Sequence, residues 1–447
     1  MHKKKRKAVI LGAGESGTGA AILALKQGFD VFVSDKGEIK TQYKNMLQNN
    51  NIPFEENKHT ENAILNADII VKSPGIPDTA EIIYKAKLQT VPVISEIEFA
   101  GKYTDAKMIC ITGSNGKTTT TELTYHILKS AGLNVGLAGN VGHSLALQVA
   151  ENNFDVFVVE LSSFQLDGMK DFKADIAILL NITPDHLDRY ENKFENYVNS
   201  KFKIIQNQTK TDAFIYCTDD DVITSEIAKR LIKAKQFPFS IKKELKQGAY
   251  RKNGKIIIDI NSKQFTMENG LLALEGDHNE YNSMAAGITA LLNGISDEQL
   301  KTSFSDFTGV EHRLEKYLKI RNIQFINDSK ATNVNSVWYA LQTVPEKIVL
   351  IMGGKDKGNE YGVLKDLVRR KVKAIVALGV DNFPIFNAFE DIVPVYDTNS
   401  MERAVHTAYQ LADEGDTVLL SPACASFDLF KNYEERGKLF KEAVRNL

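Results

Sequence analysis

The sequence predicts an α/β protein of three domains, each built around a largely parallel sheet. Short apolar runs alternate with stretches of helical periodicity along the whole chain, which is typical of βαβ units. Two of these runs lead directly into glycine-rich loops, at residues 12–17 and 113–116. The chain has 447 residues, and at about 100–150 residues per domain this length corresponds to three domains.

Apolar runs bounded by polar or glycine-rich segments define the expected strands. A hairpin is expected over Gly248–Asp259, because Asn253-Gly254 is a strong turn signal. The expected strands are Ala8–Leu11, Val31–Ser34, Ile69–Lys72, Met108–Thr112, Val156–Glu160, Ile176–Asn181, Ile323–Asn327, Ile348–Met352, Ala374–Leu378 and Thr417–Ser421.

Two segments mark the expected domain boundaries. Lys102–Lys107 is polar and precedes a new strand–glycine-loop–helix unit. Phe307–Arg313 follows a long helical region and precedes another α/β run. We therefore place the domains at residues 1–104, 105–311 and 312–447.

Composition limits the classes of function. A formal net charge of −2 argues against a general nucleic-acid-binding protein, which needs a basic surface. The three cysteines are far apart and lack metal-ligand spacing, which favours a reducing cytoplasm over a disulfide framework. The apolar stretch near the N-terminus runs straight into a glycine loop, so we interpret it as a strand and not as a signal peptide. We expect a cytoplasmic monomer without nucleic-acid or membrane partners.

The strongest chemical motif is TGSNGKTT at residues 112–119, which follows a strand and opens a helix. Its glycines let backbone N–H groups face a phosphate at the helix N-terminus. Lys117 is placed to pair with the β- and γ-phosphates of a nucleotide, and the Thr118 hydroxyl to bind Mg²⁺. Ile111 stands where the usual Walker A pattern has its first glycine, so this loop is shorter. The context favours nucleotide binding over a plain glycine turn.

A second glycine loop, Gly12–Gly17, follows the first strand. Asp35 ends the second strand, at about the distance where an acid meets a ribose. The pattern alone is a weak signal, since it fits a nicotinamide cofactor, another nucleotide diphosphate or a tight helix–strand crossing. We interpret it as a site for a nucleotide of some kind.

Acidic and imidazole side chains follow two further strands. Glu160 ends one of them, and His186 follows the other within NITPDHLDRY at residues 181–190. In a parallel sheet both emerge at the carboxyl edge, which also carries the phosphate loop. A carboxylate and a neutral imidazole there could hold Mg²⁺ beside phosphate oxygens. Without these neighbours, His186 would be read as a surface or helix-start residue.

Two polar segments in the last third also stand between a strand and a helix. NDSKATN at residues 327–333 brings Lys330 to such a position, and helix capping by Asp328 or Ser329 does not explain this cation. In LSPACASFD at residues 420–428, Ser426 is either an anion ligand or a helix N-cap.

Taken together, these motifs resemble the Mur ligases, most closely the members that add D-glutamate to UDP-N-acetylmuramoyl-L-alanine. The phosphate loop and the histidine motif mark the wider family, which includes folate polyglutamylating enzymes, whereas NDSKATN and SPACAS narrow it. The segments that carry the resemblance run in order along nearly the whole chain: Gly12–Gly17, Ser73–Ile76, TGSNGKTT, ELSSFQL at 160–166, NITPDHLDRY, His278-Asn279, His312-Arg313, NDSKATN and LLSPACASFD.

The resemblance implies a Rossmann-like N-terminal domain for the UDP precursor, a central P-loop ATPase-like domain, and a Rossmann-like C-terminal domain that closes on ATP and the amino acid. It implies ATP and Mg²⁺ as cofactors and peptidoglycan precursor synthesis as the pathway. The implied catalytic residues are Lys117, His186 and Lys201. The implied metal ligands are Thr118, Glu160, His186 and Lys201, the last as a carbamate, because a bare ammonium would repel Mg²⁺.

The resemblance also implies contacts with each substrate. Asn279 and Asn282 lie on one helical face, the first near adenine. Tyr433 stands where the family often has Phe. Of the two neighbouring lysines, we choose Lys357 over Lys355 as the contact with the amino-acid substrate. The implied ATP-binding residues are Gly113, Ser114, Asn115, Gly116, Lys117, Thr118, Thr119, Asn279, Arg313 and Asp328. The implied substrate-binding residues are Ser16, Asp35, Lys36, Ser73, Gly75, Asn140, Ser162, Lys330, Thr332, Lys357, Ser426, Phe427 and Tyr433.

The implied reaction forms an acyl phosphate from ATP and the alanine carboxylate, which the D-glutamate amine then attacks. Three alternatives stay open at this point. An NAD-dependent oxidoreductase would use Gly12–Gly17, but TGSNGKTT would then have no function. A P-loop regulatory module would hydrolyse ATP without amino-acid dependence. A ligase of the same family could add another amino acid.

Overall fold

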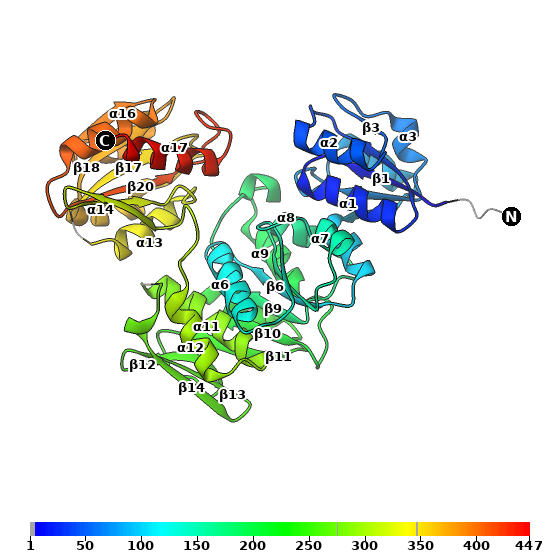
Figure 1. Ribbon diagram of the computed structural model, residues 1–447, viewed down its shortest axis with the longest axis horizontal. Helices are drawn as coiled ribbons and strands as arrows, with labels where there is room; N and C mark the ends of the chain where they lie inside the picture. The colour runs from blue at the N-terminus through cyan, green and yellow to red at the C-terminus, as the bar shows by residue number, and fades with distance from the viewer. Residues whose placement is uncertain (1–4, 275, 346) are drawn as a thin grey trace. The chain divides into compact units, whose positions relative to one another are not determined.

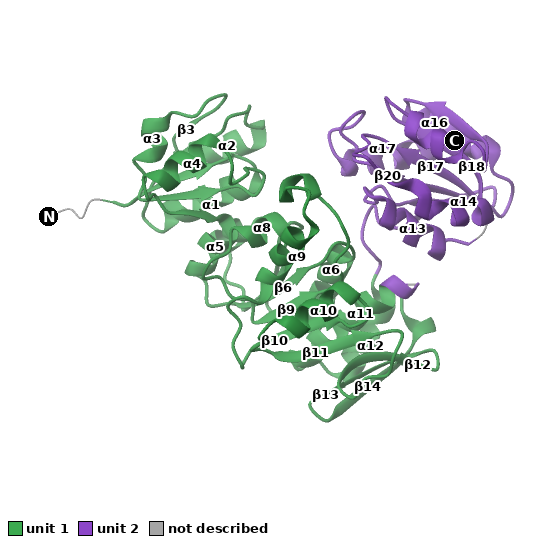
Figure 2. Ribbon diagram, turned by 180° about the vertical axis from the view of Figure 1, so that it is seen from behind, with its two compact units in different colours: residues 1–273, 279–307 green, residues 274–278, 308–447 purple. Residues whose placement is uncertain are grey.

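Figure 1 shows the computed structural model of the chain, which describes residues 5–274, 276–345 and 347–447. The chain forms two compact units, coloured separately in Figure 2. Unit 1 comprises residues 1–273 and 279–307 and contains two sheets, and unit 2 comprises residues 274–278 and 308–447 and contains the third. The predicted α/β class with three largely parallel sheets is confirmed.

The first sheet of unit 1 has five parallel strands in the order β3-β2-β1-β4-β5. The apolar run of the central strand is buried on both faces, as expected when helices cover both sides of a parallel sheet. Its strands are β1 (Lys7–Leu11), β2 (Asp30–Ser34), β3 (Phe54–Glu55), β4 (Ile69–Lys72) and β5 (Val93–Ser95). Its helices are α1 (Glu15–Lys26), α2 (Thr41–Asn49), α3 (Glu61–Leu65), α4 (Glu81–Leu88), α5 (Glu96–Ala100) and the 3₁₀ turn η1 (Gly101–Tyr103).

The second sheet of unit 1 has nine strands in the order β14-β13-β12-β11-β10-β9-β6-β8-β7, antiparallel only from β12 to β14. The strands are β6 (Lys107–Thr112), β7 (Val135–Gly139), β8 (Val156–Glu160), β9 (Ile176–Leu179), β10 (Ala213–Cys217), β11 (Lys235–Ser240), β12 (Gly248–Lys252), β13 (Lys255–Ile260) and β14 (Lys263–Glu268). The helices are α6 (Lys117–Ser130), α7 (Leu145–Glu151), α8 (Ser163–Asp167), η2 (Leu187–Tyr190), α9 (Phe194–Phe202), η3 (Lys203–Ile205), α10 (Asp221–Lys229), η4 (Asn269–Leu271), α11 (Asp277–Leu292) and α12 (Asp297–Asp306).

The predicted hairpin is the β12–β13 turn. Asn253 and Gly254 both have positive φ, 51° and 70°, between the paired residues Lys252 and Lys255. Positive φ at both central positions is the requirement of the two-residue turn that suits strand twist. The hairpin prediction is confirmed.

The sheet of unit 2 has six strands in the order β15-β16-β20-β17-β18-β19, antiparallel only between β15 and β16. The last strand, β20, lies between β16 and β17, so the strand order reverses there, which is where open α/β sheets bind ligands. The strands are β15 (Glu315–Ile320), β16 (Ile323–Asn327), β17 (Ile348–Gly353), β18 (Val372–Leu378), β19 (Val395–Thr398) and β20 (Thr417–Ala423). The helices are α13 (Val334–Thr343), η5 (Tyr361–Leu364), α14 (Lys365–Lys371), α15 (Phe383–Phe389), α16 (Met401–Leu411) and α17 (Tyr433–Arg445).

Within unit 1, helices α1, α5 and α7 join the two sheets. Gly19 of α1 lies so close to α7 that a Cβ there would come within 2.0 Å of the Ser144 hydroxyl. Glu98 of α5 accepts hydrogen bonds from the backbone N–H groups of Lys170, Asp171 and Phe172 at 2.9–3.1 Å through its Oε2. Buried apolar residues run continuously from the first sheet into the second. The first and second sheets therefore share one hydrophobic core.

Glu96, the first residue of α5, is a buried carboxylate in this region. Its Oε1 accepts a hydrogen bond from the Ala146 N–H at 2.6 Å, in the first turn of α7. Burial, reinforced by the charge of Glu15, raises the pKa of Glu96 from 4.5 to about 7. Folding therefore favours the protonated form of this side chain.

We expect Glu96→Gln to change how stability depends on pH. In the wild type the folded state holds a proton that the unfolded state releases between pH 4.5 and 7, so stability from this group falls as pH rises through that window. The glutamine keeps the acceptor and has no charge to bury. The variant should gain on the order of 3 kcal/mol over the wild type by pH 8, and little at pH 4.5. Thermal unfolding at a series of pH values measures this difference.

Glu151→Gln is the matched control, because Glu151 ends α7 and is exposed. Its difference from the wild type should not vary across the same pH range. A flat difference for Glu96→Gln as well would contradict the raised pKa.

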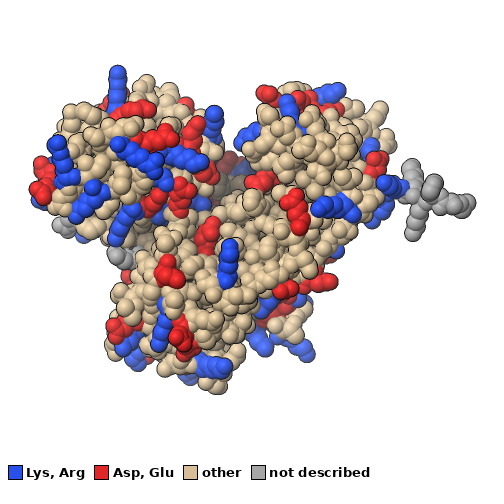
Figure 3. All heavy atoms as spheres, in the orientation of Figure 1, with Lys and Arg blue, Asp and Glu red and all other residues tan. Residues whose placement is uncertain are grey.

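The described residues include no helix long and apolar enough to cross a bilayer. Basic and acidic side chains are interspersed on the face shown in Figure 3. This distribution agrees with the formal net charge of −2.

Candidate functional site

The phosphate-binding loop lies between the end of β6 and the start of α6. Gly116 has φ 82°, and a Cβ at this position would come within 2.5 Å of Asn282 Oδ1. Both the backbone conformation and the space therefore require glycine. Helix α6 begins directly at Lys117, so its first-turn N–H groups face the loop. The local geometry is that of an anion site.

The loop is fastened to the segment after β9. Asn181 accepts hydrogen bonds from the N–H of Ser114 through its carbonyl, at 2.9 Å, and from the N–H of Asn115 through Oδ1, at 2.8 Å. The Ser114 hydroxyl donates to the Thr183 carbonyl at 2.8 Å. Because the N–H groups of Ser114 and Asn115 already donate to Asn181, the N–H groups nearest the start of α6 are better placed to bind phosphate.

The Lys117 ammonium lies against its own loop. Its Nζ donates hydrogen bonds to the carbonyls of Gly113 and Ser114, both at 2.8 Å. A nucleotide phosphate in the loop would offer the same cation a charged acceptor, which forms stronger hydrogen bonds than a carbonyl.

Glu160 lies at the end of β8, paired with Ile111 of β6. Its side chain is 1% exposed. Oε1 accepts a hydrogen bond from Asn140 Nδ2 at 2.8 Å, whereas Oε2 is buried and has no hydrogen-bond partner in the described part of the chain. A buried carboxylate oxygen without a partner is costly, and a divalent cation would satisfy it. Glu160 and the buried Thr118 thus fit the predicted magnesium site.

His186 lies on the loop between β9 and η2. Its backbone has φ 52°, which is unusual for a residue other than glycine and marks a constrained position. The ring contacts the edge of Phe164, with centroids 5.3 Å apart, and its Nε2 is 3.6 Å from Asp185 Oδ2. The side chain is exposed, and its predicted role as a metal ligand stays a prediction.

Lys201 of α9 is 1% exposed, which is rare for a lysine. Its Nζ donates hydrogen bonds to Thr112 Oγ1 at 3.1 Å and to the Gly113 carbonyl at 2.9 Å. Burial first, and the charge of Lys117 second, lower the pKa of Lys201 well below its usual value, although Asp185, Glu160 and Asp167 oppose the shift. The neutral amine is therefore favoured, and this is the form that reacts with CO₂.

The two asparagines of α11 meet the phosphate-loop helix. Asn282 donates a hydrogen bond from Nδ2 to Asn279 Oδ1 at 3.1 Å and accepts one from the Thr120 hydroxyl at 3.1 Å. Both asparagine side chains are buried. The predicted adenine-side residue Asn279 is thus connected to α6 through Asn282.

In unit 2, Asp328 follows β16 and is buried. It accepts hydrogen bonds from the Ser421 hydroxyl at 2.8 Å and from the Leu314 N–H at 3.2 Å. Burial raises the pKa of Asp328 to about 6, although the charge of Arg313 opposes the shift. The predicted ATP residues Arg313 and Asp328 are therefore electrostatically coupled.

The predicted D-glutamate residues follow β16, β17 and β20. Lys330 lies with its ammonium 5.3 Å from the centre of the Tyr433 ring. Ser426 is buried. Thr332, Lys357 and Phe427 are exposed. All follow the carboxyl ends of strands next to the point where the strand order reverses.

Arg436 of α17 is a residue that the sequence did not indicate. It is 1% exposed, and its guanidinium donates hydrogen bonds to the Ser329 hydroxyl and carbonyl at 3.0 and 2.8 Å and to the Cys424 carbonyl at 3.1 Å. Burial lowers its pKa to about 10. It thereby joins the NDSKATN and SPACAS segments. Its surroundings in the sequence, YEERGKLF, look like an ordinary amphipathic helix and give no local signal.

In the predicted nucleotide site of the first sheet, the acidic residue already accepts hydrogen bonds from the protein backbone. Asp35 accepts hydrogen bonds from the Ala13 N–H at 2.6 Å and from the Gly37 N–H at 2.8 Å. A Cβ on Gly17 would come within 1.8 Å of the Gly12 carbonyl, so the helix and strand cross tightly. Both features serve the turn itself. The remaining predicted residues, Ser16, Lys36, Ser73 and Gly75, lie on or beside this loop and after β4.

Ser162 caps α8 and forms a reciprocal pair of hydrogen bonds with Gln165. Its predicted contact with substrate stays a prediction.

Among the described residues, Glu311, His312 and Glu315 form the one group of three or more His, Cys, Asp or Glu side chains that lie close enough together to hold a metal. Lys441 already bridges the two carboxylates, at 2.6 and 2.9 Å, and Asn327 Nδ2 lies 2.8 Å from the His312 ring, so we interpret the group as an ion-pair network.

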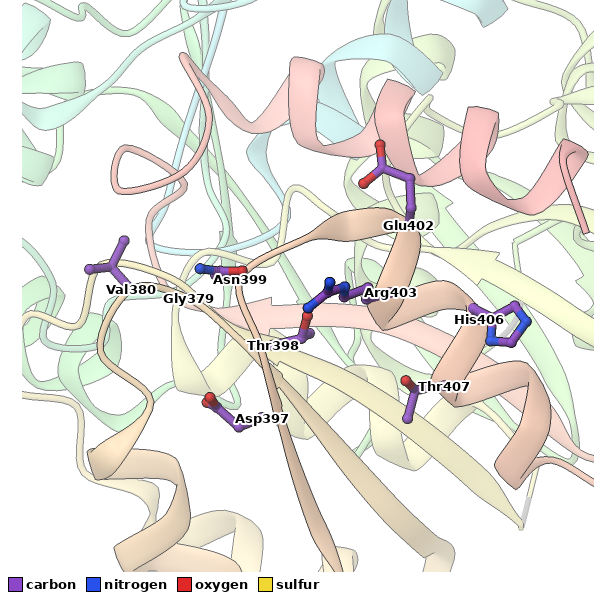
Figure 4. A pocket seen from close by; sticks show the side chains of 9 residues that line it. All are labelled: Gly379, Val380, Asp397, Thr398, Asn399, Glu402, Arg403, His406 and Thr407. Atoms are coloured by element: carbon purple, nitrogen blue, oxygen red, sulfur yellow. The ribbon is translucent and has the colours of Figure 1, made fainter.

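A cavity of about 620 Å³ opens in unit 2, between the ends of β18 and β19 and helix α16 (Figure 4). Its lining contains none of the predicted site residues. The lining residues are Gly379, Val380, Asp397, Thr398, Asn399, Glu402, Arg403, His406 and Thr407.

Three sequence families match the chain. They are described as MurD N-terminal domain (residues 7–82), Mur ligase middle domain (residues 111–290) and Mur ligase, glutamate ligase domain (residues 312–424). Relatives named UDP-N-acetylmuramoylalanine--D-glutamate ligase are 59% identical in Bacteroides fragilis and Bacteroides thetaiotaomicron, over 99% of this chain and 100% of theirs. One from Christiangramia forsetii is 56% identical over the same shares.

Solved structures show the same fold at lower identity. UDP-N-acetylmuramate-alanine ligase from Thermotoga maritima has a TM-score of 0.63 at 20% identity, covering 99% of both chains. MurF ligase from Thermotoga maritima, in complex with ADP, has a TM-score of 0.61 at 16% identity, covering 93% of this chain and 95% of its own.

Proposed function

This chain belongs to the Mur ligase family, and we propose that it adds D-glutamate to UDP-N-acetylmuramoyl-L-alanine, using ATP to activate the carboxylate. The observation that carries the proposal is the buried Glu160 carboxylate beside the phosphate loop, with one oxygen lacking a hydrogen bond. The identity of 59% to D-glutamate ligases over the full chain supports the choice of amino acid.

The chemistry follows from the weakness of a carboxylate as an electrophile. Transfer of the γ-phosphoryl group of ATP to the alanine carboxylate gives an acyl phosphate and ADP. The D-glutamate amine then attacks the acyl carbon, and the tetrahedral oxyanion collapses to the amide with release of phosphate. Lys117 and the first-turn N–H groups of α6 stabilise the charge on the transferring group.

Mg²⁺ bound at this edge would neutralise phosphate oxygens as a Lewis acid. Thr118 and Glu160 would hold one ion, and His186 with carbamylated Lys201 a second. The fit rests on the unpartnered Glu160 Oε2 and on the buried amine of Lys201, whose pKa is lowered by burial. Carbamylation converts that amine into an anionic oxygen ligand.

We assign the tasks of the domains in the same way. Residues 1–104 bind the UDP precursor, residues 105–311 bind ATP, and residues 312–447 bind D-glutamate and close on ATP. Closure would exclude water, which otherwise hydrolyses the acyl phosphate. The protein is proposed to act as a cytoplasmic monomer.

Phosphate release tests the proposal. With ATP, Mg²⁺ and UDP-N-acetylmuramoyl-L-alanine, release should depend on D-glutamate and stay at background with L-glutamate or L-lysine. Release with L-lysine instead would indicate a ligase for another amino acid. Release without any amino acid would exclude the ligase and favour a regulatory ATPase.

A further inference from the structure

The turn that carries Lys357 is folded around the carboxylate of Asp356. Asp356 Oδ1 accepts hydrogen bonds from the N–H groups of Gly358 at 2.7 Å and Asn359 at 2.9 Å. Its Oδ2 accepts one from the Tyr361 hydroxyl at 2.6 Å. One side chain thus fixes the backbone on the C-terminal side of Lys357 and ties it to the start of η5.

The same turn is attached to the segment that leads to Ser426. The Lys355 N–H donates to the Ala425 carbonyl at 2.8 Å, and Asn359 Nδ2 donates to the Ala423 carbonyl at 3.2 Å. The Tyr361 hydroxyl also lies 3.2 Å from Cys424 Sγ. These contacts bracket the turn on both sides of Lys357 and end one residue before Ser426.

Tyr361 is buried and held by packing. It is 6% exposed, and its ring packs edge-on against Phe389 with centroids 5.7 Å apart. Burial raises the pKa of Tyr361, so its hydroxyl stays protonated and donates to Asp356. Removal of the hydroxyl in Tyr361→Phe abolishes these hydrogen bonds and keeps the ring that packs against Phe389.

Lys357 itself is exposed and has a long, flexible side chain. A lysine that binds a carboxylate loses side-chain conformational entropy. If its backbone is already fixed, no further backbone entropy is lost on binding. We propose that Asp356 and Tyr361 are positioning residues. They hold the Lys357 turn at a fixed position relative to Ser426, so that both residues can bind the amino-acid substrate. This inference rests on the proposed function, in which both residues contact D-glutamate.

The test uses Tyr361→Phe, Asp356→Asn and the double variant in the full-length enzyme, with Tyr409→Phe as the matched control. Tyr409 lies on α16, and its ring packs near Phe325 in a different apolar cluster from that of Tyr361. We expect the KM for D-glutamate to rise about 10-fold in each single variant, while kcat and the KM for ATP change less than about twofold. Because the pair acts as one unit, the double variant should be no worse than the more impaired single variant.

Several results would overturn the inference. An unchanged KM for D-glutamate in Tyr361→Phe would remove the positioning role, as would multiplied effects in the double variant. An equal loss in kcat and in every KM, with a lower unfolding temperature, would indicate general destabilisation. If the wild type and Tyr409→Phe show no D-glutamate dependence, the proposed function fails first and this inference with it.

Discussion

We expect Glu160→Gln to lower the D-glutamate-dependent rate of phosphate release about 10³-fold at saturating ATP and Mg²⁺. Glu160 ends β8 beside the phosphate loop, and its Oε2 has no hydrogen-bond partner within the described residues. Glutamine keeps one oxygen and loses the negative charge that a divalent cation requires. A metal contributes several kcal/mol to the transition state of phosphoryl transfer, and about 4 kcal/mol corresponds to 10³ in rate.

Stability separates this loss from unfolding. Glutamine removes a buried charge, so the unfolding temperature of Glu160→Gln should equal or exceed that of the wild type. The exposed Glu151→Gln serves as the control for both measurements. A Glu160→Gln enzyme with wild-type rate and the wild-type dependence on Mg²⁺ would exclude Glu160 as a ligand and remove the main support for the proposed site.

We expect Lys201→Ala to lower the same rate by about 10²- to 10³-fold, and added acetate or formate to restore part of it. The alanine leaves space where a carbamate would stand, and a small carboxylate can supply the missing anionic oxygen. The burial of Lys201 and the lowered pKa of its amine favour the neutral form, whose nitrogen attacks CO₂. Rates measured against carboxylate concentration, together with a ¹³CO₂-labelled carbamate resonance in the wild type, check both halves of the prediction.

Lys203→Ala provides the matched control. Lys203 is two residues further along the chain and donates to Asp167 Oδ1 at 2.8 Å. Its loss should leave the rate nearly unchanged and insensitive to acetate. Full activity in Lys201→Ala, or equal rescue of both variants, would contradict the carbamate.

The sequence could predict the parts of the fold that depend on local patterns. Each of the ten expected strands corresponds to an observed strand, with ends that differ by no more than two residues. The β12–β13 hairpin follows from Asn253-Gly254, because a two-residue turn depends on the backbone freedom of these two positions. The phosphate loop follows from the glycines between β6 and α6 for the same reason.

Only the tertiary structure decided which polar groups are used internally. The predicted ribose ligand Asp35 accepts backbone N–H groups of the surrounding turns through both of its oxygens. The predicted substrate residue Asn140 hydrogen-bonds Glu160. Their contacts with substrate stay predictions. Arg436 gave no signal, because its partner Ser329 lies 107 residues away in the sequence. Strands and turns are set by neighbouring residues, whereas a side chain's partner is set by whichever distant segment the sheet order brings beside it.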